Sequence, residues 1–280
     1  MGRSIRTGLA GAAAGVVLLT VGCGGDDEGS PLSRPDVDEP AASTTTTLAP
    51  TGGEFAAYCD AALAIETVPE MELDPDLPED EANAAAADWV TTELQPLVEA
   101  VVAEAPPEIE DDLLTQAAAV DQAAATGDFS SFGGPEVDAA EVRTHAFDVE
   151  SCGWQVQDVN ATEYSFGDIP PTVGVGPTSF ELINDGAELH EMVLARKNPG
   201  VTETVEELAA LPDEEAQAKV TTVGSVYTDP DTQDYVVVDL EAGDYVMLCF
   251  VPMGMTSEDD VPPDSAPHYT EGMLAEFTVG

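Results

Sequence analysis

The chain has 280 residues and a formal net charge of −49, because 56 acidic side chains stand against 7 basic ones. This length allows one large or two small domains, and a content of 43% hydrophobic residues is sufficient for ordinary cores. So negative a chain repels phosphate backbones and anionic lipid headgroups, which excludes nucleic acid as a partner.

An export signal is predicted over residues 1–23. Arg3 and Arg6 give it a positively charged start, and an apolar run follows from Leu9 to Val21. Its end, Leu19-Thr-Val-Gly-Cys23, resembles a bacterial lipobox, in which the cysteine is lipidated and becomes the mature N-terminus. We therefore expect an extracytoplasmic lipoprotein anchored to the cell membrane through Cys23. A plain secretory signal that is cleaved nearby is the alternative.

The next part of the chain changes from a polar tether to a helical pattern. Residues 24–52 are rich in Gly, Asp, Pro, Ser and Thr, a composition that predicts a flexible linker. Residues 53–153 are rich in alanine and have helical periodicity, which predicts an antiparallel all-α helical bundle. Four helices are expected, at about 54–65, 81–104 with a kink at Pro96, 106–127 and 135–152.

The cysteines of the exported part allow one disulfide. Cys59 and Cys152 lie near the two ends of the helical region, so a bond between them would join its first and last helices. Cys249 then remains reduced. A bond from Cys249 to Cys59 or to Cys152 is the competing arrangement. His145 is a lone histidine on a helix, and we expect a surface or packing role for it.

From Trp154 the apolar pattern changes to period two, which is typical of strands. Residues 154–280 are therefore predicted to form an all-β Greek-key sandwich. A helical insert is expected at 205–219, broken at Pro212. The expected strands cover 159–166, the segment that leads from Phe180 to the turn at Asn184-Asp-Gly186, 193–195, 220–227, 235–240, 245–251 and 274–279.

Four potential metal ligands occur in this half of the chain. They are His190, Cys249, His268 and Met273. Two imidazoles, one thiolate and a weak axial thioether are the ligands of a type 1, or blue, copper site. The softness of sulfur favours copper, and a weak axial ligand keeps both oxidation states accessible.

The order and context of these four residues resemble the plastocyanin-like cupredoxins. His190 ends a segment of the form F-x-L-x-N-x-G-x-x-x-H, and His268 and Met273 form a terminal His-x4-Met motif. The resemblance covers about residues 158–280. It implies a cupredoxin-like domain that binds one copper ion and carries electrons, without enzyme activity.

The chain departs from the family pattern at two points. Eighteen residues, Phe250 to Pro267, separate Cys249 from His268, where the family has a short loop that fixes the ligand geometry. Glu191 follows His190, where the family often has a small amide that braces the cysteine loop.

Two other functions remain open from the sequence. Met253 and Met255 could bind Cu(I) together with His268, which would suit copper handling, or they could simply anchor the long loop. A metal-free interaction module is the third option. No nucleophile motif or phosphate loop is present, and three histidines are too few for a multicopper oxidase, so we expect no enzyme. The partner would be a redox protein or a copper donor or acceptor, and the acidic surface favours a basic one.

Overall fold

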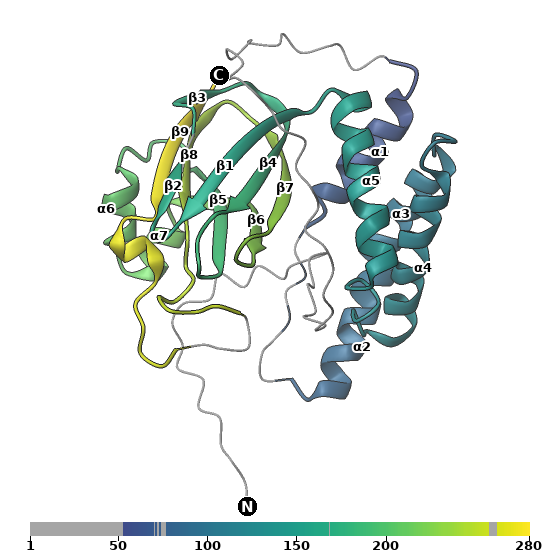
Figure 1. Ribbon diagram of the computed structural model, residues 1–280, viewed down its shortest axis with the longest axis horizontal. Coiled ribbons are helices and arrows are strands. Elements are labelled where there is room, and N and C mark those ends of the chain that lie inside the picture. The colour runs from purple at the N-terminus through teal and green to yellow at the C-terminus, as the bar shows by residue number, and fades with distance from the viewer. Residues whose placement is uncertain (1–52, 70, 72, 74–76, 168, 258–261) are drawn as a thin grey trace, which may run out of the picture.

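The structure is a computed structural model that describes residues 53–280, apart from 70, 72, 74–76, 168 and 258–261. A helical region is followed by a sandwich of two β-sheets, so the predicted combination of an all-α and an all-β part is confirmed (Figure 1). The export signal, the lipidation of Cys23 and the linker at 24–52 lie outside the described residues. Within the part that is described, no helix is long and apolar enough to span a bilayer.

The helices differ from the expected four at one place. The single helix predicted over 81–104 is divided by a π-helical turn, η1, just before Pro96. Proline lacks an N–H group and its ring crowds the preceding turn, and a wide π turn relieves that crowding. The helices are α1 (Ala56–Glu66), α2 (Glu79–Trp89), η1 (Val90–Leu94), α3 (Gln95–Ala103), α4 (Glu110–Thr126) and α5 (Pro135–Cys152).

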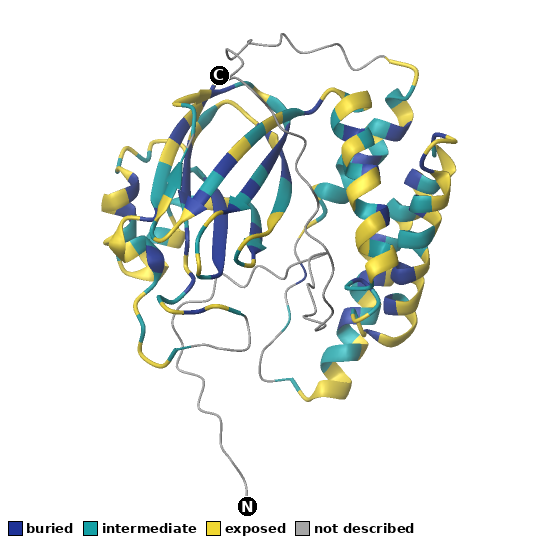
Figure 2. Cartoon of the chain, viewed as in Figure 1, coloured by how far each residue is buried: buried dark blue, intermediate teal, exposed yellow. Residues whose placement is uncertain are grey.

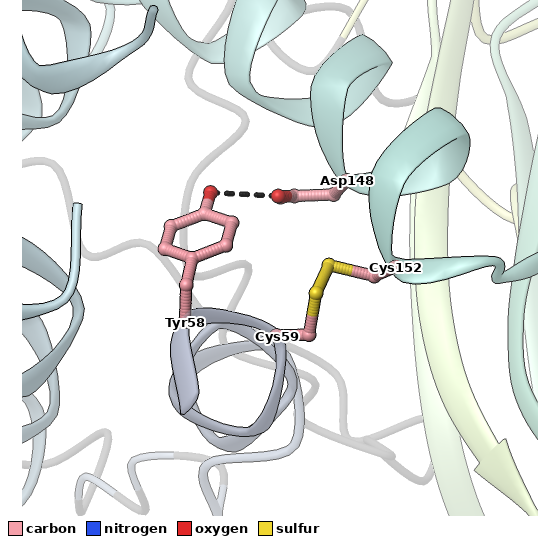
Figure 3. Close-up of a disulfide and its surroundings, with 4 residues drawn as sticks. All are labelled: Tyr58, Cys59, Asp148 and Cys152. Atoms are coloured by element: carbon pink, nitrogen blue, oxygen red, sulfur yellow. Dashed lines mark hydrogen bonds between the residues drawn. A yellow bond between two sulfur atoms is a disulfide. The ribbon is translucent and has the colours of Figure 1, made fainter. Parts of the chain in front are cut away.

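A disulfide joins the first and last of these helices. Cys59 on α1 and Cys152 at the end of α5 are bonded, with their Cα atoms 5.4 Å apart (Figure 3). Beside this bond, the Tyr58 hydroxyl donates a 2.6 Å hydrogen bond to the buried carboxylate of Asp148. The predicted pairing is thus present. Cys249 is a free, buried thiol, so the competing pairings of Cys249 are wrong.

Replacing both bonded cysteines by serine should destabilise the helical region strongly. The bond closes a loop with a sequence separation of 93 residues. We expect Cys59→Ser/Cys152→Ser to lower the free energy of unfolding by about 4–5 kcal/mol, because the unfolded chain regains the entropy of the open loop. Urea unfolding followed by circular dichroism measures this change, and an unaltered midpoint would contradict a structural role for the bond.

The sandwich consists of one four-stranded and one five-stranded sheet, with strand orders β2-β1-β4-β7 and β3-β9-β8-β5-β6. The chain passes from one sheet to the other between β2 and β3, β3 and β4, β4 and β5, β6 and β7, and β7 and β8. The expected helical insert is present as α6 (Val205–Ala209) and α7 (Asp213–Gln217). The strands are β1 (Gln155–Thr162), β2 (Ser165–Gly167), β3 (Thr172–Val173), β4 (Gly176–Asn184), β5 (His190–Lys197), β6 (Val220–Thr228), β7 (Gln233–Leu240), β8 (Gly243–Leu248) and β9 (Leu274–Val279).

One predicted strand is wrong. The strand expected over 159–166 is a hairpin of β1 and β2, because the chain reverses at Tyr164, whose φ is 70°. Period-two alternation continues through both arms of a tight hairpin, so the pattern alone did not reveal the turn. The core between the sheets includes the buried side chains of Phe180, Leu182 and Leu194. Buried positions recur along the strands of the sandwich (Figure 2).

The helical region packs against β7 of the four-stranded sheet. His145 on α5 stacks on Tyr235 of β7, with ring centroids 3.5 Å apart, and its Nε2 lies 2.9 Å from a carboxylate oxygen of Glu181 on β4. His145 therefore has a packing role, at the interface between the helical region and the four-stranded sheet. Between the two regions lies a cavity of about 530 Å³, whose lining includes Glu66 and Glu141.

The carboxyl groups at this interface are costly to ionise. Burial and the carboxylates of Asp148 and Glu141 raise the pKa of Glu66 to about 8. Burial raises the pKa of Glu141 to about 7 and that of Asp148 to about 6. Each of these groups binds its proton more tightly in the folded chain than in the unfolded chain, so the fold favours the neutral forms.

Stability should consequently fall as the pH rises through this range. The penalty from Glu66 is absent below its ordinary pKa of 4.5 and is complete above its folded pKa of about 8. The wild type should lose unfolding free energy between pH 5.5 and pH 8.5. We expect that loss to be smaller in Glu66→Gln, by about 1 kcal/mol or more. Urea unfolding at both pH values measures this, with the exposed Glu99→Gln as the matched control. Equal pH dependence in the wild type and Glu66→Gln would contradict the assignment.

Candidate metal centre

The four predicted ligands are fully buried and lie where neighbouring elements end. His190 is the first residue of β5, and Cys249 follows the last residue of β8. His268 opens a short 3-10 helix, η2 (His268–Glu271), and Met273 directly precedes β9. Because β5, β8 and β9 are neighbours in one sheet, these ends meet at the pole opposite β3 and the C-terminus (Figure 1).

Three of the four side chains converge on one point. The Nδ1 atoms of His190 and His268 are 3.2 Å apart, and Nδ1 of His268 is 3.4 Å from Sγ of Cys249. The donor atoms of all three lie within 4.8 Å of one another. Tetrahedral bonds of about 2.0–2.3 Å would place such donors roughly 3.3–3.7 Å apart, so a single ion fits between them.

Met273 belongs to the same site through its backbone and its burial. The N–H of Cys249 donates to the carbonyl of Met273 at 3.2 Å, and the N–H of Met273 donates to the carbonyl of His268 at 3.3 Å. The Met273 and Cys249 side chains are members of one apolar cluster. Among the described residues, no further histidine, cysteine or carboxylate joins the three converging donors.

The long segment between Cys249 and His268 does not separate these two ligands. Pro252 and Pro267 form an antiparallel bridge, and the N–H of His268 donates to the carbonyl of Val251 at 2.9 Å. The loop is therefore closed at its base by these two contacts. Cys249 and His268 thus lie side by side despite the eighteen residues between them, with Sγ and Nδ1 3.4 Å apart.

Glu191 braces the cysteine loop. Its backbone N–H donates to Sγ of Cys249 at 3.3 Å, and its carboxylate accepts from the N–H of Phe250 at 3.2 Å. The side chain is buried. A carboxylate here fastens the loop by accepting a backbone hydrogen bond, and the N–H at Sγ would stabilise a thiolate.

The electrostatics keep all three donors neutral without a metal. Burial raises the pKa of the Cys249 thiol to about 12. Burial, with a contribution from His268, lowers the pKa of His190 to about 4, and burial also lowers the pKa of His268. Neutral imidazoles have a free lone pair for a metal ion, whereas the thiol must lose its proton to a strongly binding cation.

Other residues of the site carry no strong signal in the sequence. The side-chain N–H₂ of Asn184 donates to the carbonyls of Glu188 and Thr228, at 2.8 and 2.9 Å, and so shapes the turn that precedes His190. A carboxylate oxygen of Glu188 lies 3.0 Å from Nε2 of His268. Asn184 was visible as part of the F-x-L-x-N motif. Glu188 offered only its position two residues before a candidate ligand.

Met253 and Met255 have a structural role in the loop between Cys249 and His268. Met255 is buried in the apolar cluster that also contains Cys249 and Met273, and its carbonyl accepts from the N–H of Leu189 at 2.8 Å. Met253 is half-buried, and its N–H donates to the carbonyl of Ala266 at 3.0 Å. These contacts favour the loop-anchoring interpretation of the pair.

Comparison with known proteins gives only distant likenesses. No protein-family model and no curated protein matches the chain. Solved structures that align with it include auracyanin from Roseiflexus castenholzii, at 18% identity over 45% of this chain and 97% of that one, with a TM-score of 0.29. Auracyanin A from Chloroflexus aurantiacus, described as a "blue" copper protein, aligns at 15% identity over 45% and 98%, with a TM-score of 0.28.

Rusticyanin from Thiobacillus ferrooxidans aligns at 16% identity over 45% of this chain and 78% of that one, with a TM-score of 0.27. With identities and TM-scores this low, these likenesses do not establish a function for this chain. A functional assignment rests instead on the buried donor atoms of this chain itself.

Proposed function

We propose that the β-sandwich is a cupredoxin-like domain that binds one copper ion through His190, Cys249, His268 and Met273 and serves as an electron carrier. The convergence of two imidazole nitrogens and one thiol sulfur in a buried pole of the sandwich carries this proposal. Bound copper would supply a one-electron couple between Cu(II) and Cu(I).

The donor set favours copper over zinc. Structural zinc sites take four strong ligands in a tetrahedron, and catalytic sites take three plus an accessible position for water. Here three strong donors meet, the fourth candidate is a thioether, and all four residues have no exposed surface. A thiolate, two imidazoles and a weak axial methionine are instead typical of blue copper sites.

The chain's part in electron transfer is to hold its donors still. The segment from His268 to Met273 fixes the backbone of Cys249, whose carbonyl accepts from the N–H of Tyr269 at 3.0 Å and whose N–H donates to the carbonyl of Met273 at 3.2 Å. His268 is held by the bridged base of the loop. Ligands fixed in this way keep their positions when the charge at the centre changes, which favours fast one-electron exchange. No substrate-binding or nucleophilic group is needed for this role.

The proposed setting is the outer face of the cell membrane. The Cys59–Cys152 disulfide suits an oxidising compartment, and the lipobox-like sequence would anchor the chain at Cys23. The net charge of −49 favours a basic redox partner and makes the association sensitive to salt.

Copper addition tests the proposal directly. We expect the purified full chain to bind one Cu(II) per molecule and to develop an intense visible absorption from thiolate-to-copper charge transfer. Cys249→Ser should remove that absorption, because the thiolate is the donor in the transition. A folded Cys249→Ser variant with the same absorption, or a wild type that binds no copper, would refute the proposed function.

Variants of the methionines separate electron transfer from the second candidate, Cu(I) handling, in which the buried thioether of Met255, a member of the apolar cluster of Cys249 and Met273, would bind the ion. We expect Met253→Leu/Met255→Leu to retain tight copper binding, because leucine fills a methionine site at little cost. Met273→Leu should retain copper but raise the reduction potential, because the axial ligand tunes it. Titration with Cu(I) and protein-film voltammetry measure both. Loss of Cu(I) binding in the double variant alone would favour copper handling.

A further inference from the structure

We propose that Glu188 is a positioning residue of the metal centre, which holds His268 in the tautomer and orientation that direct Nδ1 to the ion. The role in copper binding rests on the proposed function, whereas the role in fixing the tautomer concerns the metal-free chain and is tested separately.

The Glu188 carboxylate joins three parts of the site. Its Oε2 lies 3.0 Å from Nε2 of His268 and also accepts from the backbone N–H of Gly254 in the long loop. Its Oε1 accepts from the Tyr164 hydroxyl at 3.2 Å. One side chain thus links the ligand, the loop that delivers the ligand, and the turn between β1 and β2.

These contacts determine which nitrogen of His268 carries the proton. Oε2 of Glu188 already accepts from the backbone N–H of Gly254, and an oxygen that accepts from Nε2 of His268 as well places the ring proton on that nitrogen. In a neutral imidazole, Nδ1 then has a free lone pair. That lone pair faces the other two donors, 3.4 Å from Sγ of Cys249 and 3.2 Å from Nδ1 of His190.

His190 has no comparable partner. Its Nε2 is buried and makes no hydrogen bond within the described part of the chain. With Nδ1 of His268 unprotonated, Nδ1 of His190 can donate to it across the 3.2 Å contact. To offer Nδ1 to an ion, His190 would have to carry its proton on Nε2 instead. The chain therefore presets one imidazole and leaves the other to rearrange.

Glu188 is itself held rigidly. Its backbone N–H donates to the Glu163 carboxylate at 3.0 Å, and its carbonyl accepts from the Asn184 side chain at 2.8 Å. Its side chain is 18% exposed, and that of His268 is 0% exposed. The ring of Tyr164 packs edge-on against His268, with centroids 5.0 Å apart. The carboxylate and this ring together close the imidazole edge to solvent.

The tautomer can be measured without copper. Nitrogen-15 NMR of the metal-free full chain should show His268 protonated at Nε2 alone. Glu188→Ala should give a mixture of tautomers or the Nδ1-protonated form. Glu271→Gln is the matched control, because it removes an exposed carboxylate from the same short helix and should leave the His268 signals unchanged. Unaltered His268 tautomers in Glu188→Ala would overturn the proposal.

Copper affinity gives the second readout. We expect Glu188→Ala to weaken Cu(II) binding by about 10–100-fold, as removal of a carboxylate behind a ligating histidine typically does, and Glu188→Gln to weaken it less. Glu188→Gln also keeps the size of the side chain, should the alanine variant fail to fold. Wild-type affinity in both variants would overturn the proposal. A wild type that binds no copper would refute the proposed function, and the NMR result would still decide the role of Glu188.

Discussion

The antiparallel pairing of β8 with β5 on one side and β9 on the other carries the metal centre. Cys249 follows the middle strand of the three, and it is held by backbone bonds to Tyr269 and Met273 on one side and by the N–H of Glu191 at its sulfur on the other. His190 opens the first neighbour and Met273 precedes the second. A shift of one residue in either pairing would turn the alternate side chains to the opposite face of the sheet and remove a donor from the pole.

The bridge between Pro252 and Pro267 adds the one ligand that no strand holds. It closes the base of the long loop and holds His268 beside Cys249. Insertions beyond such a bridge cost little, because the entropy of closing a loop grows slowly with its length. The spacing of ligands in the sequence is then a poor guide to their separation in space.

Much of this arrangement follows from local patterns in the sequence. The change from helical to period-two alternation near Trp154 predicts both regions, and the turn at residues 184–186 predicts where β4 ends and His190 follows. The reversal at Tyr164 was not predictable, because a residue with positive φ that is not glycine leaves no compositional mark. The bridge at the loop base and the contact from Glu188 to His268 depend on long-range packing, which no local pattern encodes.

The many acidic residues of the chain also affect its interior, because some of their carboxyl groups are buried. The interface between helices and sandwich contains several carboxyl groups with raised pKa values, including Glu66, Glu141 and Asp234. Burial of these groups costs stability when they ionise. A disulfide between α1 and α5 stabilises the helical region against this cost. The three converging donors of the metal centre all belong to the sandwich.

We propose that a thiolate and two imidazoles of this chain share one copper ion. X-ray absorption at the copper K edge of the copper-loaded full chain tests it most directly. We expect one short copper–sulfur contact together with two imidazole nitrogens. A coordination sphere of nitrogen and oxygen only, or of sulfur only, would contradict it.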